Sequence, residues 1–333
     1  MNDFETGATS LLDHATHSIQ VGSKSFAAAS RLFDPATRRS AVMLYAWCRH
    51  CDDVIDGQEA GRSATLLSQT QAQQRLAALI EQTHAVYAGR PVSTPAFAAF
   101  SEVVKRHGIR QAYALDHLAG FAMDVHQREY RCIDDTLDYC YHVAGVVGLM
   151  MAQIMEVRDE QTLDRACDLG LAFQLTNIAR DIVEDAAMGR CYLPADWLAE
   201  RGIPRERMAE PEYRQDLAVL AQRLIGLAEP YYLSAEAGLT SLSWRSAWAV
   251  ATAGAVYRQI GVKVEAAGAH AWDARISTSK VDKLRLLILG AWRALSSRGR
   301  HWPARPAQLW QRPRHACAAD QHASPAAVRE AGQ

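Results

Sequence analysis

The sequence predicts an all-α protein, and three observations support this fold class. Apolar residues recur with the 3.6-residue period of helices along almost the whole chain. No segment shows the sustained alternation of apolar and polar side chains that is typical of strands. Turn residues such as Gly89, Pro91 and Gly108 separate the periodic segments.

Length and composition describe an ordinary globular protein. With 333 residues, 49% of them hydrophobic, the chain can bury a large core, and its net charge of −1 gives no reason to expect a nucleic-acid partner. The seven cysteines follow no disulfide pattern, and residues 1–16 do not resemble a signal peptide. The longest weakly charged run, 246–257, is too short to span a bilayer. We therefore expect a cytoplasmic protein that at most rests on a membrane surface.

The helices can be expected in order from their patterns and boundaries. A first helix, 10–30, carries Leu11, Ile19 and Phe26 on one broad face. Asp34 and Pro35 signal the start of a second, because an acid can cap free N–H groups and proline fits the first turn. The further expected helices are 66–87, 95–105, 111–124, 137–157, 160–185, 213–232, 239–267 and 279–297, with a loop at 189–204.

Residues 1–297 contain no clear linker and are expected to form one domain. After residue 297 the composition shifts to Arg, Pro, Ala and His without a helical stripe. We expect 298–333 to form a basic, poorly ordered tail, either without a role or weakly attracted to anionic lipid.

The expected helix 160–185 ends in a row of oxygen-bearing side chains. Asn177, Asp181 and Asp185 are spaced at i, i+4 and i+8, which places them on one helical face. Gln174 extends this row, and Arg180 lies beside it. Carboxylate and amide oxygens suit a hard cation such as Mg²⁺, although a single D-x-x-x-D is more often a solvated helix face.

A second acidic row follows the helix that begins near residue 35. Asp52 and Asp56 share a face at i, i+4, and Arg49 and Tyr45 precede them by successive turns. Like charges at this spacing repel each other. Two such rows facing a cavity become favourable when they share divalent cations, which suggests a metal–diphosphate clamp. The metals and arginines would stabilise a departing diphosphate.

Six motifs carry a resemblance to a known family. They are S-K-S-F at 23–26, Y-x-x-C-R at 45–49, D-D-x-x-D at 52–56, Y-C-Y-x-V-A-G-x-V-G at 139–148, Q-x-x-N-x-x-R-D-x-x-x-D at 174–185 and G-R-C-Y-L-P at 189–194. In this order they resemble the squalene/phytoene synthase family across most of the chain. Y-R-Q-I-G at 257–261 and A-W-D-A-R at 271–275 look like its bacterial phytoene synthase branch.

The resemblance implies an isoprenoid synthase bundle of helices around a central cavity. It also implies a transferase of carotenoid biosynthesis that condenses two geranylgeranyl diphosphates head to head into phytoene. The reaction would pass through a cyclopropylcarbinyl diphosphate and release two diphosphates. Mg²⁺ would be the cofactor, Mn²⁺ could replace it, and NADPH is not expected.

The resemblance also assigns roles to residues. Metal would be held by Asp52, Asp56, Asn177, Asp181 and Asp185, of which the four aspartates are the catalytic groups. Diphosphate would be contacted by Arg49, Arg180, Tyr257 and Arg275. The prenyl channel would be lined by Phe26, Tyr45, Tyr139, Gly145, Gly148, Gly170 and Gln174. Without the resemblance, the aromatic residues would be read as core and the glycines as helix-packing positions.

Several alternatives stay open. Squalene and dehydrosqualene synthases share the motifs but act on two farnesyl diphosphates, and the sequence does not reveal cavity depth. A catalytically inactive assembly protein would not need both acidic rows. A head-to-tail prenyltransferase or terpene cyclase would lack the S-K-S-F and V-A-G-x-V-G segments. The oily product leads us to expect work at the inner face of the cell membrane and hand-over to phytoene desaturase.

Overall fold

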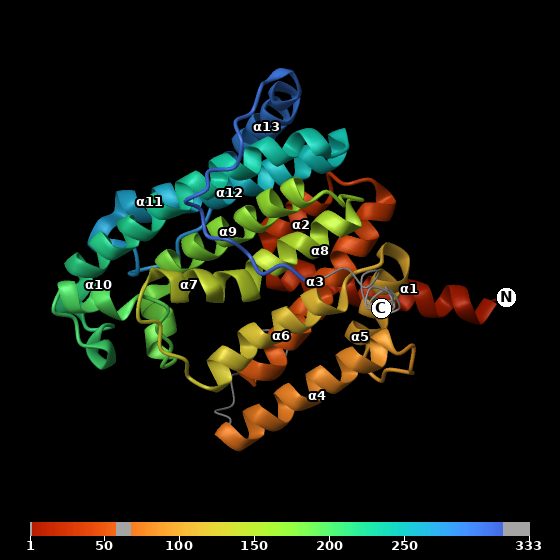
Figure 1. Cartoon of the computed structure of the whole chain (residues 1–333), viewed down its shortest axis with the longest axis horizontal. Helices are drawn as coiled ribbons and strands as arrows, with labels where there is room; N and C mark the ends of the chain where they lie inside the picture. Colours follow the sequence, from red (N-terminus) through yellow and green to blue (C-terminus); the bar gives the residue numbers. More distant parts are fainter. Residues whose placement is uncertain (1, 58–67, 316–333) are drawn as a thin grey trace, which may run out of the picture.

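The computed structural model describes residues 2–57 and 68–315, which form helices and connecting loops without a strand (Figure 1). The predicted all-α class is therefore confirmed. The α-helices are α1 (Asn2–Gly22), α2 (Lys24–Ser30), α3 (Pro35–Asp56), α4 (Gln69–Tyr87), α5 (Pro95–His107), α6 (Gln111–Val125), α7 (Ile133–Cys140), α8 (Val146–Ile154), α9 (Glu160–Ala187), α10 (Ala195–Glu200), α11 (Arg214–Gly238), α12 (Trp244–Ala267) and α13 (Lys280–Ser296).

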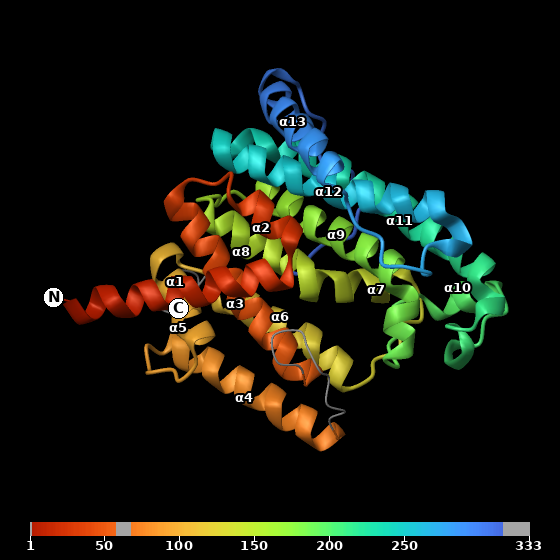
Figure 2. The same cartoon turned by 180° about the vertical axis from the view of Figure 1, so that it is seen from behind.

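The helices stack in layers around α9. Figure 1 and its reverse view, Figure 2, show α4, α5 and α6 on one side, α11, α12 and α13 on the other, and α3, α8 and α9 between them. α9 packs against α8, α11 and α12, whereas α3 packs against α1 and α5. The middle layer is therefore covered on both sides, which lets it enclose a cavity.

Helix α3 is fixed at both ends and along its buried face. The Asp34 carboxylate accepts hydrogen bonds from the backbone N–H groups of Ala36 and Thr37, both at 3.0 Å, as expected for an N-cap. Gly57 ends the helix at φ 65°, a left-handed conformation that glycine adopts readily. Trp47 is fully buried and stacks on Phe100 of α5 with ring centroids 4.0 Å apart. The acidic row therefore sits at the end of a firmly held helix.

The expected helix 10–30 is two helices in the structure. Ser23 adopts an extended conformation between α1 and α2, and its side chain accepts a hydrogen bond from the backbone N–H of Phe26 at 3.3 Å. A serine in this position caps the new helix and so favours the break. The turn directs Phe26 toward Tyr45 of α3 and Tyr257 of α12.

The expected helix 137–157 also differs, because a π-helical turn (Tyr141–Gly145) separates α7 from α8. Glycines bring this segment against α9. A Cβ atom on Gly148 would clash with the Ala166 carbonyl oxygen, and one on Gly170 would clash with the Ala144 carbonyl oxygen. Only glycine permits this close approach of the two backbones.

Residues 300–315, here called the C-terminal strap, lie across the middle layer (Figure 1). The guanidinium of Arg305 bonds to the Asp168 carboxylate at 2.7 and 2.8 Å, and Trp310 packs on Tyr141 with centroids 5.5 Å apart. Residues 300–315 thus follow a defined path in place of the expected poorly ordered tail, because their arginines reach carboxylates of α9, among them the buried Asp168. Residues 316–333, the rest of that expected tail, lie outside the described residues.

Candidate active site

The two predicted acidic rows meet at one end of the middle layer. The Arg190 side chain, on the loop after α9, bonds to the Asp56 carboxylate at the end of α3. Its positive charge also acts on Asp52 of α3 and Asp185 of α9, where it counters part of the rise in pKa that burial causes. One guanidinium therefore lies within reach of both rows, as a shared site requires.

Ionising the carboxylates of the site costs free energy. Desolvation by the surrounding protein, followed by repulsion from Asp56, raises the pKa of the partly exposed Asp52 to about 7. Burial, followed by repulsion from Asp181, raises the pKa of Asp185 to about 7 as well. Groups with such values carry a charge near neutral pH only at a free-energy cost, which a bound cation would offset.

Arginines offset part of this negative charge. Arg49 pairs with Asp52 at 3.0 Å and with Asp53 at 2.7 Å. Arg180 bonds to the neighbouring Asp181, with 2.8 Å between its Nε and the carboxylate. These cations can also attract a diphosphate, since guanidinium groups match phosphate oxygens.

Arg275 approaches the same row from the loop between α12 and α13. Its guanidinium lies 3.6 Å from Asp181 and 3.0 Å from Glu184, and 60% of its side chain is exposed. The predicted diphosphate-contacting arginines are therefore grouped around the acidic rows, and Arg275 is the one most open to solvent among Arg49, Arg180 and Arg275.

The donor set of the site fits a hard cation. Asn177 Oδ1 is buried and has no hydrogen-bond partner, so its lone pairs are free to bind a ligand. The Asp52 side chain remains 40% exposed and thus accessible. Within residues 2–57 and 68–315, no three His, Cys, Asp or Glu side chains converge as a ready-made metal group. Water and phosphate oxygens would have to complete the coordination shell, which is the usual situation for Mg²⁺.

A cavity of about 300 Å³ begins beside these residues and continues into the middle layer. Its polar end is bounded by Gln174 and Asn177, and its inner end by Phe33, Met151 and Ala249. The predicted channel residues that line it are Phe26, Tyr45, Gly148, Gly170 and Gln174. Tyr257, which was predicted to contact diphosphate, lines it as well. Most of the remaining lining is apolar, as a prenyl chain requires.

Two predicted channel residues are placed elsewhere. Gly145 is not among the cavity-lining residues; a Cβ there would lie 2.7 Å from Leu171 Cδ1, so the glycine serves helix packing. Tyr139 stacks on Tyr192 with centroids 4.4 Å apart and donates a hydrogen bond to Asp124 at 3.3 Å. It therefore lies beside the acidic end instead of along the cavity wall.

Aromatic rings gather where the cavity meets the charged end. Phe173 stacks on Tyr257 with centroids 4.1 Å apart, and Phe26 lies 5.7 Å from Tyr257 and 6.2 Å from Tyr45. Phe173 was not predicted as a site residue, although it directly precedes Gln174 in the second motif. Phe173 lines the cavity beside Gln174, and aromatic faces attract cations.

The structure adds two groups that the sequence analysis missed: the carboxylate of Asp124 and the guanidinium of Arg190, which acts on several carboxylates of the site. Burial raises the pKa of Asp124, on α6, to about 6, and Arg190 and the Tyr192 hydroxyl partly counter this effect. Tyr192 donates to Asp124 at 3.0 Å. The available signal was the segment G-R-C-Y-L-P, in which Gly189 (φ 77°) turns Arg190 back toward the end of α9.

Comparisons with known proteins agree with this geometry. The model of the squalene/phytoene synthase family matches residues 19–284. The 15-cis-phytoene synthase of Pantoea ananas is 63% identical over 304 residues, covering 91% of this chain and 98% of the relative. The 15-cis-phytoene synthase of a Paracoccus strain is 49% identical over 91% of this chain and 98% of its own length.

Solved structures agree as well. A crystal structure of a dehydrosqualene synthase in complex with ligand matches with a TM-score of 0.77 and 28% identity, covering 87% of this chain and 98% of that chain. A squalene synthase from Alicyclobacillus acidocaldarius, 19% identical, has a TM-score of 0.67 over 78% of this chain and 95% of its own, and supports the fold alone. With matching motifs, fold and relatives, the chain belongs to the squalene/phytoene synthase family.

Proposed function

We propose that this protein is a prenyltransferase that condenses two geranylgeranyl diphosphates head to head into phytoene. The observation that carries the proposal is that two acidic rows share Arg190 beside the polar end of an apolar cavity, which Gln174 and Asn177 line. The high identity to bacterial phytoene synthases supports the C20 substrate and the assignment to carotenoid biosynthesis. No NADPH is required, because the final cation loses a proton and is not reduced.

The acidic end holds and activates the diphosphate. Asp52, Asp56, Asn177, Asp181 and Asp185 would hold Mg²⁺, for which Mn²⁺ could substitute. When bound, the cation supplies positive charge that stabilises the departing diphosphate. Arg49, Arg180 and Arg275 pair with carboxylates in the structure, and each would exchange part of this pairing for phosphate oxygens when the substrate binds.

The cavity holds the prenyl chains and protects the cations. The C–O bond of one allylic diphosphate breaks and diphosphate leaves. The 2,3 double bond of the second substrate attacks the resulting cation, and loss of a proton closes the ring to a cyclopropylcarbinyl diphosphate. The second C–O bond then breaks, the skeleton rearranges and a proton leaves. Apolar walls exclude water throughout, and the faces of Phe26, Phe173 and Tyr257 stabilise passing positive charge.

A product assay tests this function. The purified protein is incubated with Mg²⁺ and radiolabelled geranylgeranyl or farnesyl diphosphate, with and without NADPH, and a matched EDTA sample serves as control. We expect a C40 hydrocarbon with a central conjugated triene from the longer substrate, formed independently of NADPH and absent in EDTA. Squalene formed only with NADPH would replace the proposal with a squalene synthase. Dehydrosqualene as the main product is the second candidate, prompted by the structural likeness to a dehydrosqualene synthase.

The product also bears on location and partners. A C40 hydrocarbon cannot remain dissolved in water. The protein must therefore release it into a lipid phase or to an enzyme that consumes it, such as a phytoene desaturase. Work at the inner face of the cell membrane would satisfy either requirement.

A further inference from the structure

Helix α13 exposes a continuous apolar stripe. Val281 is 77% exposed, Leu284 62%, Ile288 64%, Trp292 63% and Leu295 61%. Their spacing of three and four residues places all five on one helical face. Contiguous apolar surface of this kind on a soluble fold usually marks an interaction site. We call these five residues the α13 stripe.

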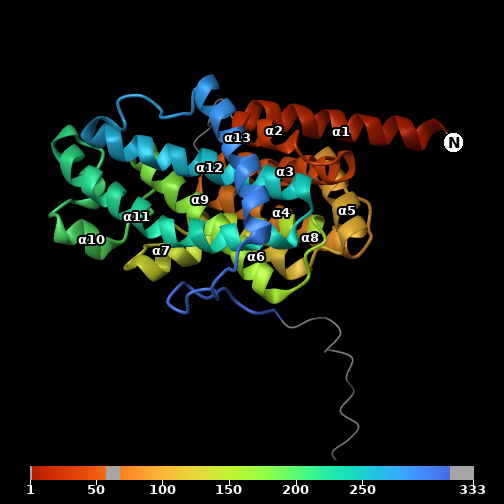
Figure 3. The same ribbon diagram turned by 90° about the horizontal axis from the view of Figure 1, so that it is seen from above.

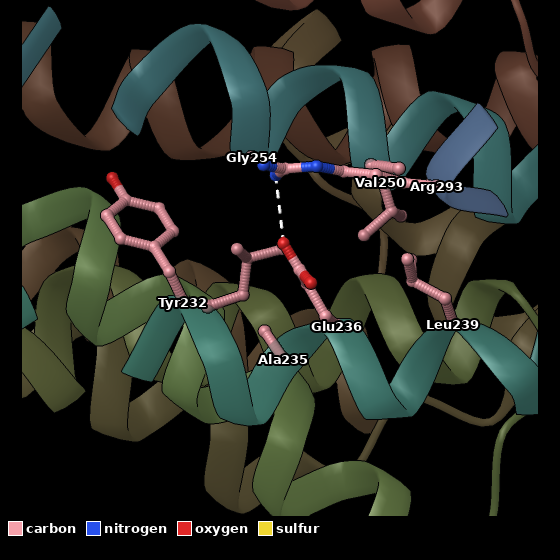
Figure 4. A pocket seen from close by; sticks show the side chains of 9 residues that line it. Tyr232, Ala235, Glu236, Leu239, Val250, Gly254 and Arg293 are labelled. Carbon is pink, nitrogen blue, oxygen red and sulfur yellow. Dashed lines mark ion pairs between the residues drawn. The ribbon is translucent and has the colours of Figure 1, made fainter. Parts of the chain in front are cut away.

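The opposite side of α13 is fixed to the bundle, so the stripe cannot turn inward. A Cβ atom on Gly290 would lie 2.9 Å from the Thr252 Cα, which shows how closely α13 approaches α12. Trp248 Nε1 donates to the Leu287 carbonyl at 2.9 Å. In Figure 4, Arg293 reaches across to Glu236 of α11, at 2.9 Å, over a pocket of only about 20 Å³.

The border of the stripe is basic. Between residues 280 and 300 the chain has six Lys or Arg residues and a single acid, Asp282, which pairs with Lys263 at 2.6 Å. Lys280 and Arg285 lie exposed in the first turns, and Arg298 and Arg300 lie exposed just beyond the helix end. Anionic lipid headgroups attract such residues, and a tryptophan is favoured at a membrane interface.

The geometry fits a helix that lies on a bilayer. Among the helices of the described ranges, none is long and apolar enough to cross a membrane. Figure 3 shows α13 on the outside of the molecule, crossing α12. A helix with one apolar face and basic flanks lies in the plane of the headgroups, with its apolar side inserted.

An apolar pocket lies beside the stripe, next to the short helix α2. It has a volume of about 270 Å³ and lies between α2, α12 and α13. Leu284 of the stripe lines it, and so does Ala29 of α2, which also lines the central cavity. The short helix α2 and the adjacent turns of α12 therefore lie between the inner part of the cavity and the surface beside the stripe.

We propose that the α13 stripe docks on an anionic phospholipid bilayer and that the pocket between α2 and α13 is the route from the central cavity into the lipid. The docking stands on exposure and charge alone. The route rests on the proposed function, because only an apolar product needs it. The two parts are therefore tested separately.

Vesicle flotation tests the docking with the full-length chain. Vesicles of phosphatidylcholine with phosphatidylglycerol are compared with phosphatidylcholine alone. We expect binding to the anionic vesicles and a loss of at least about tenfold in the variant Ile288→Gln/Trp292→Gln/Leu295→Gln. The matched control, Val219→Gln/Leu233→Gln, changes exposed apolar residues of α11 and should bind like the wild type.

Three outcomes would overturn the docking. The first is equal binding of the stripe variant and the wild type, and the second is no binding of the wild type to anionic vesicles. The third is a wild-type dimer that the stripe variant converts to monomer, which would make a second copy the occupant. Circular dichroism checks that each variant is folded, and Trp292→Gln alone repeats the test if the triple variant is not.

The route is tested with Ala28→Phe, which fills the pocket from α2. With vesicles and geranylgeranyl diphosphate, we expect one rapid turnover followed by slowed steady-state release. Steady-state turnover equal to that of the wild type would remove the route and leave the docking intact. A wild type without turnover would instead contradict the proposed function, whatever the flotation result.

Discussion

Carboxylates lie close to arginines near both ends of α9, with different consequences. Near its start, Asp168 is fully buried and accepts two bonds from Arg305 and one from Ser234 Oγ at 2.6 Å. Near its end, Asp185 lies among acids and shares Arg190 with Asp56 and other carboxylates. The first site has a full set of partners, whereas the second has more negative than positive charge.

The difference distinguishes charged groups that stabilise the fold, such as Asp168, from charged groups that suit a bound ligand, such as Asp52 and Asp185. Burial raises the pKa of Asp168, but its bonds to Arg305 and Ser234 counter that effect. At the other end, repulsion between neighbouring acids adds to burial and brings the pKa of Asp52 and Asp185 to about 7. Satisfied buried charges specify structure, while an unbalanced cluster in a cavity is typical of a functional site.

The largest expected effect is on activity at the unbalanced site. The variant Asp52→Asn/Asp185→Asn should lower kcat/KM by about 10³-fold, because it removes ligands for the cation that stabilises the departing diphosphate. Its thermal midpoint in EDTA should stay the same or rise, since the repulsion is gone. Turnover of geranylgeranyl diphosphate and thermal unfolding by circular dichroism measure the two effects. Near-normal activity would refute the metal clamp.

The converse change at the balanced site should affect stability. Asp168→Asn leaves the Arg305 guanidinium, whose side chain is only 14% exposed, without its charged partner. Breaking a buried pair in this way costs about 3–5 kcal/mol of unfolding free energy. Urea unfolding measures the loss, and activity per folded molecule should be unchanged below the transition. If Asp168→Asn lost activity but no stability, Asp168 would belong to the functional site and would not be a structural pair.

The sequence revealed one of these sites more fully than the other. Helical periodicity decides which side chains share a face, so the row of Asp181 and Asp185 could be predicted. The channel role of Tyr45 followed only from the family resemblance. The position of Arg190 depends on how a loop folds back after α9, and periodicity carries no such information. The strap was missed for a similar reason: the partners of Arg305 and Arg312 lie more than a hundred residues away on α9.

A smaller effect is expected on the pH dependence of stability, which should come from Asp52 of α3 and Asp185 of α9 more than from Asp168. In EDTA, the folded-state pKa of Asp52 and Asp185, about 7, exceeds the ordinary value of 3.8. The folded protein therefore holds more protons than the unfolded chain between about pH 4 and 7, and stability should fall as pH rises through this window. We expect the thermal midpoint to drop by several degrees from pH 5 to 8 and Mg²⁺ to recover part of the loss. In Asp52→Asn/Asp185→Asn the slope should be shallower, and an unchanged slope would exclude these two groups as its source.

The smallest expected effect comes from two arginines of the strap that share the same partners. Arg312 and Arg314 both pair with Glu160 and Asp164, but the Arg312 side chain is 2% exposed and that of Arg314 is 51% exposed. Solvent screens an exposed pair, so Arg314→Met should cost less than about 1 kcal/mol of unfolding free energy. Arg312→Met serves as the internal standard and should cost about 2 kcal/mol, because it removes charged hydrogen bonds in a buried position. Urea titrations of both variants measure the difference, and neither should alter turnover.

Equal losses of unfolding free energy in the two variants would mean that burial does not decide how strongly these ion pairs hold the strap. The difference between the two ends of α9 would then have to be explained by something other than the burial of their charged groups.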